Sequence, residues 1–123
     1  MSQQQGLGPR KAALFLLDNV TSEGKLLPEL IGEGALQHLS PEDRARAQRL
    51  ATLTLRWLER VDRLLARHLR KAPPDFVRNA LRLGTAELIA GGAAHGVVND
   101  VVQIIGRHRR HGALKGLANA VLR

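Results

Sequence analysis

The feature that most constrains the fold is a stretch of about 30 residues, up to Lys71, that contains neither glycine nor proline after Pro41. It opens with a strong helix-start signal, Ser40-Pro41-Glu42-Asp43, which offers a hydroxyl cap, an early proline and two acids. One stripe of residues then recurs at alternating spacings of three and four, as on one face of a helix. The stripe is Leu50, Thr54, Trp57, Val61, Leu64 and His68. Because globular helices are rarely this long, we expect a bend or break near the middle.

The composition favours helices in the rest of the chain. Hydrophobic residues make up 44% of the sequence, but Phe15, Trp57 and Phe76 are its only aromatic residues, so the core must consist of Leu, Val and Ala. Leucine and alanine are among the best helix formers, and no stretch reads as a β-strand. We therefore predict an all-α bundle of about six helices. Besides the long one, they are expected at 9–23, 26–31, 76–90 (capped by Asp75), 97–107 and from about 113 onward.

Gly84 lies in the middle of the predicted helix 76–90. Glycine in a helix interior costs about 1 kcal/mol relative to alanine. We expect this glycine to mark the close approach of another helix.

The length of 123 residues suits a single domain. We expect a disordered tail over residues 1–8 and one folded domain over 9–123. There is no cysteine, which excludes disulfides, cysteine metal sites and a thiol nucleophile within this chain. The polar start does not resemble a signal peptide, and no apolar run reaches the roughly 20 residues that span a bilayer. We predict a soluble, cytoplasmic protein.

The net charge of +8 is concentrated in two blocks. Residues 44–82 carry 11 basic and 3 acidic residues, and residues 107–123 carry 5 basic and no acidic residues. In contrast, residues 1–43 and 83–106 have net charges of −3 and −2. Concentrated positive charge of this kind is typical of proteins whose partner is rich in phosphate.

Five arginines in the first block have helical spacing. They are Arg56, Arg60, Arg63, Arg67 and Arg70. On one continuous helix they would form a row of roughly 20 Å, able to follow a nucleic-acid backbone through guanidinium–phosphate contacts. The same row could instead be a solvated face, or could dock on an acidic protein. Repulsion between close like charges favours a partner.

Other basic residues could extend this surface if the fold brings them together. Singly, each reads as ordinary surface charge. The candidates are Arg10, Lys11, Arg78, Arg82, Arg107, Arg109, Arg110 and Lys115.

Other kinds of functional site have little support in the sequence. Aromatic platforms for stacking bases are almost missing, and Trp57 reads as a core residue, so RNA binding should rest on phosphate contacts. His108 and His111 could meet on one helical face, but a third metal ligand is not apparent. No phosphate loop, nucleophile motif or paired carboxylates occur, so we expect no catalysis, metal or cofactor in this chain.

Six short motifs follow one another between residues 10 and 123. They are Arg10-Lys11-Ala12-Ala13, Leu39-Ser40-Pro41-Glu42-Asp43-Arg44, Leu55-Arg56-Trp57, Val77 to Gly84 (VRNALRLG), Val97-Val98-Asn99-Asp100-Val101-Val102 and Asn119-Ala120-Val121-Leu122-Arg123. In this order they resemble the NusB-like helical domain. LRW, LRLG and NAVLR make the chain most similar to the N-terminal domain of 16S rRNA cytosine-5 methyltransferases of the Sun/Fmu or RsmB type.

The resemblance implies a helical bundle that binds RNA, expected to be small-subunit rRNA, and packs on a catalytic domain in the same parent chain. That domain would supply the catalytic cysteine and bind S-adenosylmethionine. The sequence stops at Arg123 without a glycine cap or a following proline, so we expect the natural protein to continue. Two alternatives remain: a free-standing NusB-type antitermination factor, and a protein-interaction module that docks on an acidic partner.

Overall fold

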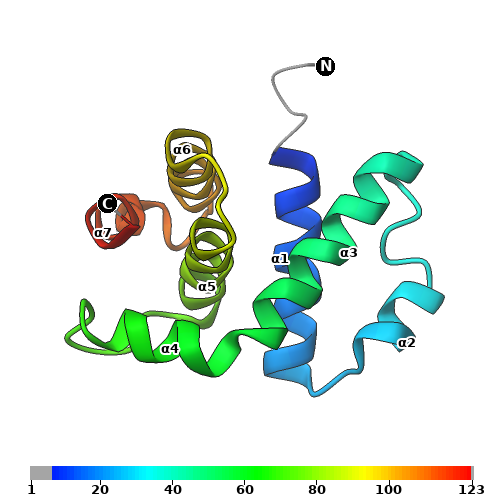
Figure 1. Ribbon diagram of the computed structural model, residues 1–123, viewed down its shortest axis with the longest axis horizontal. Coiled ribbons are helices and arrows are strands. Elements are labelled where there is room, and N and C mark those ends of the chain that lie inside the picture. The colour runs from blue at the N-terminus through cyan, green and yellow to red at the C-terminus, as the bar shows by residue number, and fades with distance from the viewer. Residues whose placement is uncertain (1–6, 123) are drawn as a thin grey trace.

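The computed structural model describes residues 7–122, which form seven α-helices and one 3-10 turn and contain no β-strand (Figure 1). The elements are α1 (Leu7–Glu23), α2 (Leu27–Gly32), α3 (Pro41–Arg56), α4 (Leu58–Ala66), α5 (Asp75–Ile89), α6 (Ala94–Gly106), η2 (Gly112–Leu114) and α7 (Lys115–Leu122). This confirms the all-α prediction. Residues 1–6 of the predicted tail lie outside the described residues, and residues 7 and 8 belong to helix α1.

Helices α1 and α5 lie side by side and antiparallel. Hydrogen bonds join them along their length, and in three of the bonded pairs each step forward along α1 is matched by an equal step back along α5. The pairs are Arg10 with Glu87, Asp18 with Asn79, and Ser22 with Asp75. We call this contact the α1–α5 seam.

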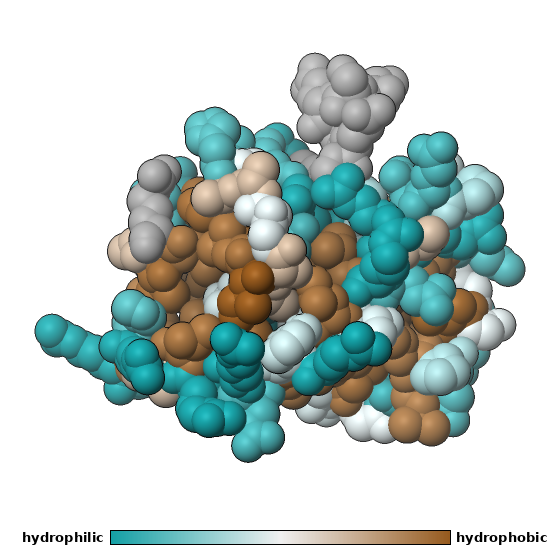
Figure 2. Space-filling view, in the orientation of Figure 1, coloured by the Kyte–Doolittle hydropathy of each residue, from teal (hydrophilic) through white to brown (hydrophobic). Residues whose placement is uncertain are grey.

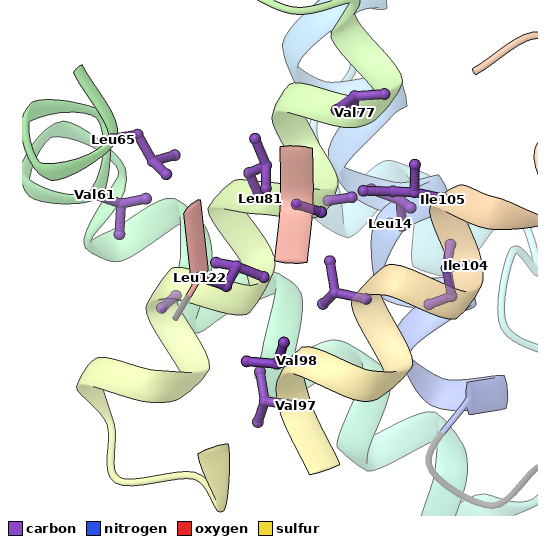
Figure 3. Close-up of a cluster of buried hydrophobic side chains, with 14 residues drawn as sticks. Leu14, Val61, Leu65, Val77, Leu81, Val97, Val98, Ile104, Ile105 and Leu122 are labelled. Carbon is purple, nitrogen blue, oxygen red and sulfur yellow. The ribbon is translucent and has the colours of Figure 1, made fainter. Parts of the chain in front are cut away.

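Two hydrophobic clusters lie on opposite sides of the seam. The first joins α1, α2 and α3, and Leu83 of α5 belongs to it. The second joins α4, α5, α6 and α7, and Leu14 of α1 belongs to it (Figure 3). Because each seam helix contributes a leucine to the cluster on its far side, both clusters depend on the pairing of α1 with α5.

The predicted long helix is broken at Trp57, which is the C-cap of α3 and the N-cap of α4. Its backbone (φ −100°, ψ 12°) leaves the α-helical region, and its carbonyl accepts the hydrogen bond that starts α4. The expected break is therefore confirmed. The helix also ends at Ala66 rather than Lys71, because the apolar stripe stops near Leu65 and His68 is exposed.

Two further local predictions had different outcomes. Ser40 caps α3 as expected, since its Oγ accepts a hydrogen bond from the Asp43 N–H at 3.2 Å. Asp75 was wrongly assigned as the cap of α5: Pro74 is the N-cap, and Asp75 is the first helical residue. There its carboxylate still faces the positive end of the helix dipole.

Gly84 is a point of close contact between α5 and both α6 and α7. A Cβ at this position would lie 3.0 Å from Leu122 Cδ1 and 3.1 Å from Val101 Cγ2. These distances are tighter than ordinary van der Waals contact, so the predicted close approach of another helix is confirmed.

Candidate nucleic-acid interface

Arg10, which was predicted to bind RNA, lies inside the seam. Only 6% of its surface is exposed to solvent. Its Nε and Nη2 donate to the two carboxylate oxygens of Glu87 at 2.7 and 3.0 Å, and its Nη1 donates to Asp100. The neighbouring carboxylates Glu87 and Asp100 raise the pKa of Arg10 against the opposing effect of burial, which is the largest single influence and lowers it. Arg10 ties α1, α5 and α6 together and is not available to a phosphate.

Arg82 has a similar structural position. It is 8% exposed, and its Nε and Nη2 donate to both carboxylate oxygens of Asp62 at 2.8 Å. Its Nη1 donates to Asn79 Oδ1 at 2.9 Å, which links the α4–α5 contact to the seam. Arg78 is half-buried, 3.7 Å from the same aspartate. Arg10 and Arg82, which were predicted to bind RNA, are therefore not available to it, and the half-buried Arg78 is only partly available.

The predicted row of five arginines is not one row. Arg56 ends α3, and Arg60 and Arg63 lie on α4 beyond the break. Arg67 is the C-cap of α4, and Arg70 lies in the following connection. All five are exposed, and Figure 2 shows hydrophilic side chains projecting from the edge of the molecule formed by α4. The charge is therefore available to a partner, but over a bent surface rather than along a straight 20 Å line.

Trp57 is neither fully buried nor free. Its side chain is half-buried and packs against the second hydrophobic cluster. The guanidinium carbon of Arg60 lies 5.3 Å from the centre of the indole ring, within the range of a cation–π contact. The interpretation of Trp57 as a core residue therefore applies to the part of the ring that packs against the cluster. Arg60 covers another part of the ring.

The second basic block forms a compact loop between α6 and α7. The loop is closed by two glycines: a Cβ on Gly112 would lie 2.7 Å from the Gly106 carbonyl oxygen, and the Lys115 side chain lies across Gly106. Inside the loop, His108 Nδ1 accepts hydrogen bonds from the backbone N–H groups of Arg110 and His111 at 3.1 and 3.2 Å. These bonds hold the loop in one shape. They leave exposed side chains on Arg107, Arg109, Arg110 and Lys115.

Three rings form a column that links this loop to α5. Phe76 contacts His108 with ring centroids 4.2 Å apart, and His108 stacks on His111 at 4.7 Å with an angle of 16° between the rings. We call Phe76, His108 and His111 the aromatic column. This column could not be predicted from the spacing of its residues, because Phe76 is more than 30 positions away from His108 and His111 in the sequence.

The aromatic column also brings parts of the two basic blocks together. Phe76 lies in the first turn of α5, directly after the segment that carries Arg67, Arg70 and Lys71. Lys11 is exposed but lies near the opposite end of the seam, since its neighbour Arg10 pairs with Glu87. Phe76 and Glu87 are about 16 Å apart along α5 at 1.5 Å per residue. Lys11 is therefore separate from the basic surface around the α6–α7 loop.

Asp18 is the acidic group on α1 that interacts with this end of the molecule. Burial raises its pKa from the usual 3.8, and the nearby Asp75 carboxylate adds to the rise. The hydrogen bond from Asn79 Nδ2, at 2.6 Å, and the nearby His108 act in the opposite direction and lower the pKa. The net effect is a carboxyl group that ionises less readily in the folded protein than it does in water.

An apolar groove lies on a different face, over α5, α6 and α7. Its apolar lining residues are Leu88, Ala94, Val98, Val102 and Leu122, and its polar ones are His95, Asn99 and Asn119. Figure 2 shows hydrophobic side chains gathered over these three helices. The groove has no charged lining residue apart from the histidine, in contrast to the α6–α7 loop.

Within residues 7–122, no group of three or more His, Cys, Asp or Glu side chains is placed to hold a metal ion. Over the same residues, no helix has the length and apolar character needed to cross a membrane. The chemistry that the described residues do offer is anion binding, through exposed guanidinium groups beside stacked rings.

Comparisons with known proteins agree with this architecture. Among solved structures, a chain in the crystal structure of a plectonemic RNA supercoil has a TM-score of 0.81 and 26% sequence identity to this protein; the match covers 96% of this chain and 91% of that chain. No curated protein matches the sequence. The sequence model of the NusB family matches residues 8–123. Because this match extends over nearly the whole chain, the protein belongs to the NusB family.

Proposed function

We propose that this chain is an RNA-binding domain, and that its exposed arginines on α4 and on the α6–α7 loop contact RNA phosphates. The observation that carries the proposal is the membership of the NusB family, together with a similar chain found in a crystal structure that contains RNA. The charge distribution supports it, because no acidic residue follows Asp100 in the sequence. Within residues 7–122, no salt bridge involves Arg107, Arg109 or Arg110, so their charges are not neutralised internally.

Titration of single-stranded RNA over a series of salt concentrations tests RNA binding. If about three to five phosphates are neutralised, the log–log slope of affinity against salt should lie near −2 to −3.5. Alanine at Arg56, Arg60 and Arg63 should make this slope shallower by about 2. An unchanged slope would remove these three arginines from the interface. If the unsubstituted chain does not bind RNA, this result would favour the alternative of a protein-interaction module that docks on an acidic protein.

We further propose that the domain acts in cytosine-5 methylation of small-subunit rRNA, as the accessory part of a larger cytoplasmic enzyme. The LRW, LRLG and NAVLR motifs support this assignment. The apolar groove over α5, α6 and α7 would pack on the catalytic domain, which would bind S-adenosylmethionine and carry the reactive cysteine. This chain would hold rRNA and supply no catalytic group.

A free-standing antitermination factor is the second candidate. The similar chain from the RNA supercoil structure favours it, because this protein covers 91% of that chain. An immunoblot of source cells with antibody against this chain separates the two. A band several times heavier than 13.5 kDa would favour the methyltransferase, whose remaining part could be assayed for cysteine-dependent methyl transfer to rRNA. A band near 13.5 kDa would favour the antitermination factor.

A further inference from the structure

The aromatic column gives the basic surface a feature that phosphate binding alone does not require. His111 is its outermost ring: it is partly exposed, stacks on His108 with one face, and has no further ring contact within residues 7–122. The inner end is anchored, because Phe76 packs against the second hydrophobic cluster. The column therefore runs from the core to the surface and ends in a single flat ring beside three exposed arginines.

We propose that the α6–α7 loop binds one unpaired nucleotide of RNA, whose base stacks on His111 while its flanking phosphates contact Arg109 and Arg110. This inference rests on the proposed RNA-binding function and names a site within it. Base–aromatic stacking tolerates any sequence, since every base has a π-face, so the site selects for single-stranded character rather than for a base identity. Paired bases are excluded, because their faces are covered by their neighbours in the duplex.

The loop is held in shape before any ligand binds. His108 Nδ1 accepts two backbone hydrogen bonds, so the hydrogen of the neutral ring lies on Nε2 and the imidazole plane is fixed between Phe76 and His111. Gly112 lies so close to the Gly106 carbonyl that a Cβ would come within 2.7 Å of its oxygen, so this compact loop requires a glycine at position 112. A site that is ordered in advance loses less conformational entropy when the nucleotide binds.

The electrostatic surroundings of the loop favour an anionic ligand. The acidic residues of neighbouring elements are Asp18 on α1 and Asp75 on α5. Asp18 already accepts a hydrogen bond from Asn79, and Asp75 accepts one from Ser22. Neither forms a salt bridge with an arginine of the loop. The guanidinium groups of Arg109 and Arg110 are thus free to bind phosphate oxygens in pairs.

The test measures binding of a fluorescein-labelled ten-nucleotide RNA to the 123-residue chain by fluorescence anisotropy at constant salt. His111→Ala should weaken binding about fivefold or more without changing the salt slope, because it removes stacking and no positive contact to phosphate. His111→Phe should bind within about twofold of the unsubstituted chain, since a ring is retained. His38→Ala, at an exposed histidine in the α2–α3 connection, is the matched control and should have no effect.

A second measurement uses only the unsubstituted chain and so does not depend on how the variants fold. The same RNA is prepared with abasic sites at all ten positions, so that no register of binding offers a base, and it should lose affinity by a similar factor. The proposal is overturned if His111→Ala and His38→Ala bind equally well, or if the fully abasic RNA binds as tightly as the intact RNA. If the unsubstituted chain binds no RNA, the proposed function fails as well; if it binds RNA and only the stacking tests fail, the function stands and this site does not.

Discussion

Arginines occur in two contrasting regions of the molecule, the α1–α5 seam and the α6–α7 loop. In the seam, Arg10 is almost fully buried, as is Arg82 at the adjoining α4–α5 contact, and each donates to both oxygens of one carboxylate. In the loop, Arg109 and Arg110 are exposed, and neither forms a salt bridge within residues 7–122. The same side chain therefore holds the fold together in one region and is left available to a partner in the other.

The difference shows that the number of basic residues overstates the binding surface of this protein. Arg10 and Arg82 are neutralised by Glu87, Asp100 and Asp62, so they add little to the field outside the molecule. The seam and the loop can then be separated by experiment, because substitutions in one should change stability and substitutions in the other should change binding. The predictions below run from the largest expected change in the free energy of unfolding to the smallest.

Arg10→Ala should lower the free energy of unfolding by about 3–5 kcal/mol, because it leaves Glu87 buried without its charged partner. Urea denaturation followed by circular dichroism measures this loss. Lys11→Ala is the matched control: its residue is adjacent but exposed, and its effect should stay within about 0.5 kcal/mol. Equal stabilities of the two variants would contradict a structural role for Arg10.

Asn79→Ala should cost about 1–3 kcal/mol. Asn79 is 1% exposed and connects three groups: its Nδ2 donates to Asp18 and Thr21, and its Oδ1 accepts from Arg82. Removal of the amide leaves buried polar atoms of its partners without a hydrogen bond. Asn99→Ala, at an exposed position of α6, is the control for loss of an asparagine from a helix. A similar small loss in both variants would show that water replaces the Asn79 bonds.

Local features of the fold were predictable from the sequence, because they depend on neighbours along the chain. The start of α3 at Ser40-Pro41, the break near Trp57 and the close contact at Gly84 all follow from spacing, capping or backbone preference. The burial of Arg10 was not predictable in this way. Its partner Glu87 is 77 positions away, and nothing near Arg10 in the sequence distinguishes it from the exposed Lys11.

The candidate site was predictable in composition but not in geometry. The second basic block correctly indicated an exposed positive loop at residues 107–110. The first block suggested a straight arginine row, which required the helix to continue to Lys71, whereas α4 ends at Ala66. The aromatic column joins segments that only the packing of α6 on α5 brings together, so no periodic pattern could reveal it.

Asp18→Asn should change the pH dependence of stability by a small amount. Burial raises the pKa of Asp18 in the folded protein, so the folded state holds its proton more tightly than the unfolded state does. The contribution of Asp18 is therefore most favourable below pH 3.8 and is lost as the pH rises through the raised pKa. The variant should gain stability relative to the unsubstituted protein over this window. Urea unfolding at several pH values measures the difference; a constant difference would contradict the shift.

Alanine at Arg107, Arg109 and Arg110 together should leave the free energy of unfolding almost unchanged, within about 0.5 kcal/mol for each exposed position. The same variant should make the salt slope of single-stranded RNA binding shallower by about 1.4, since the two proposed phosphate contacts of Arg109 and Arg110 are lost and each contributes about 0.7. Lys11→Ala, distant from the loop, should change neither quantity. A large loss of stability would mean that these arginines support the fold as Arg10 does. An unchanged slope would mean that their exposed charge does not meet RNA, and the contrast between seam and loop would then concern the fold alone.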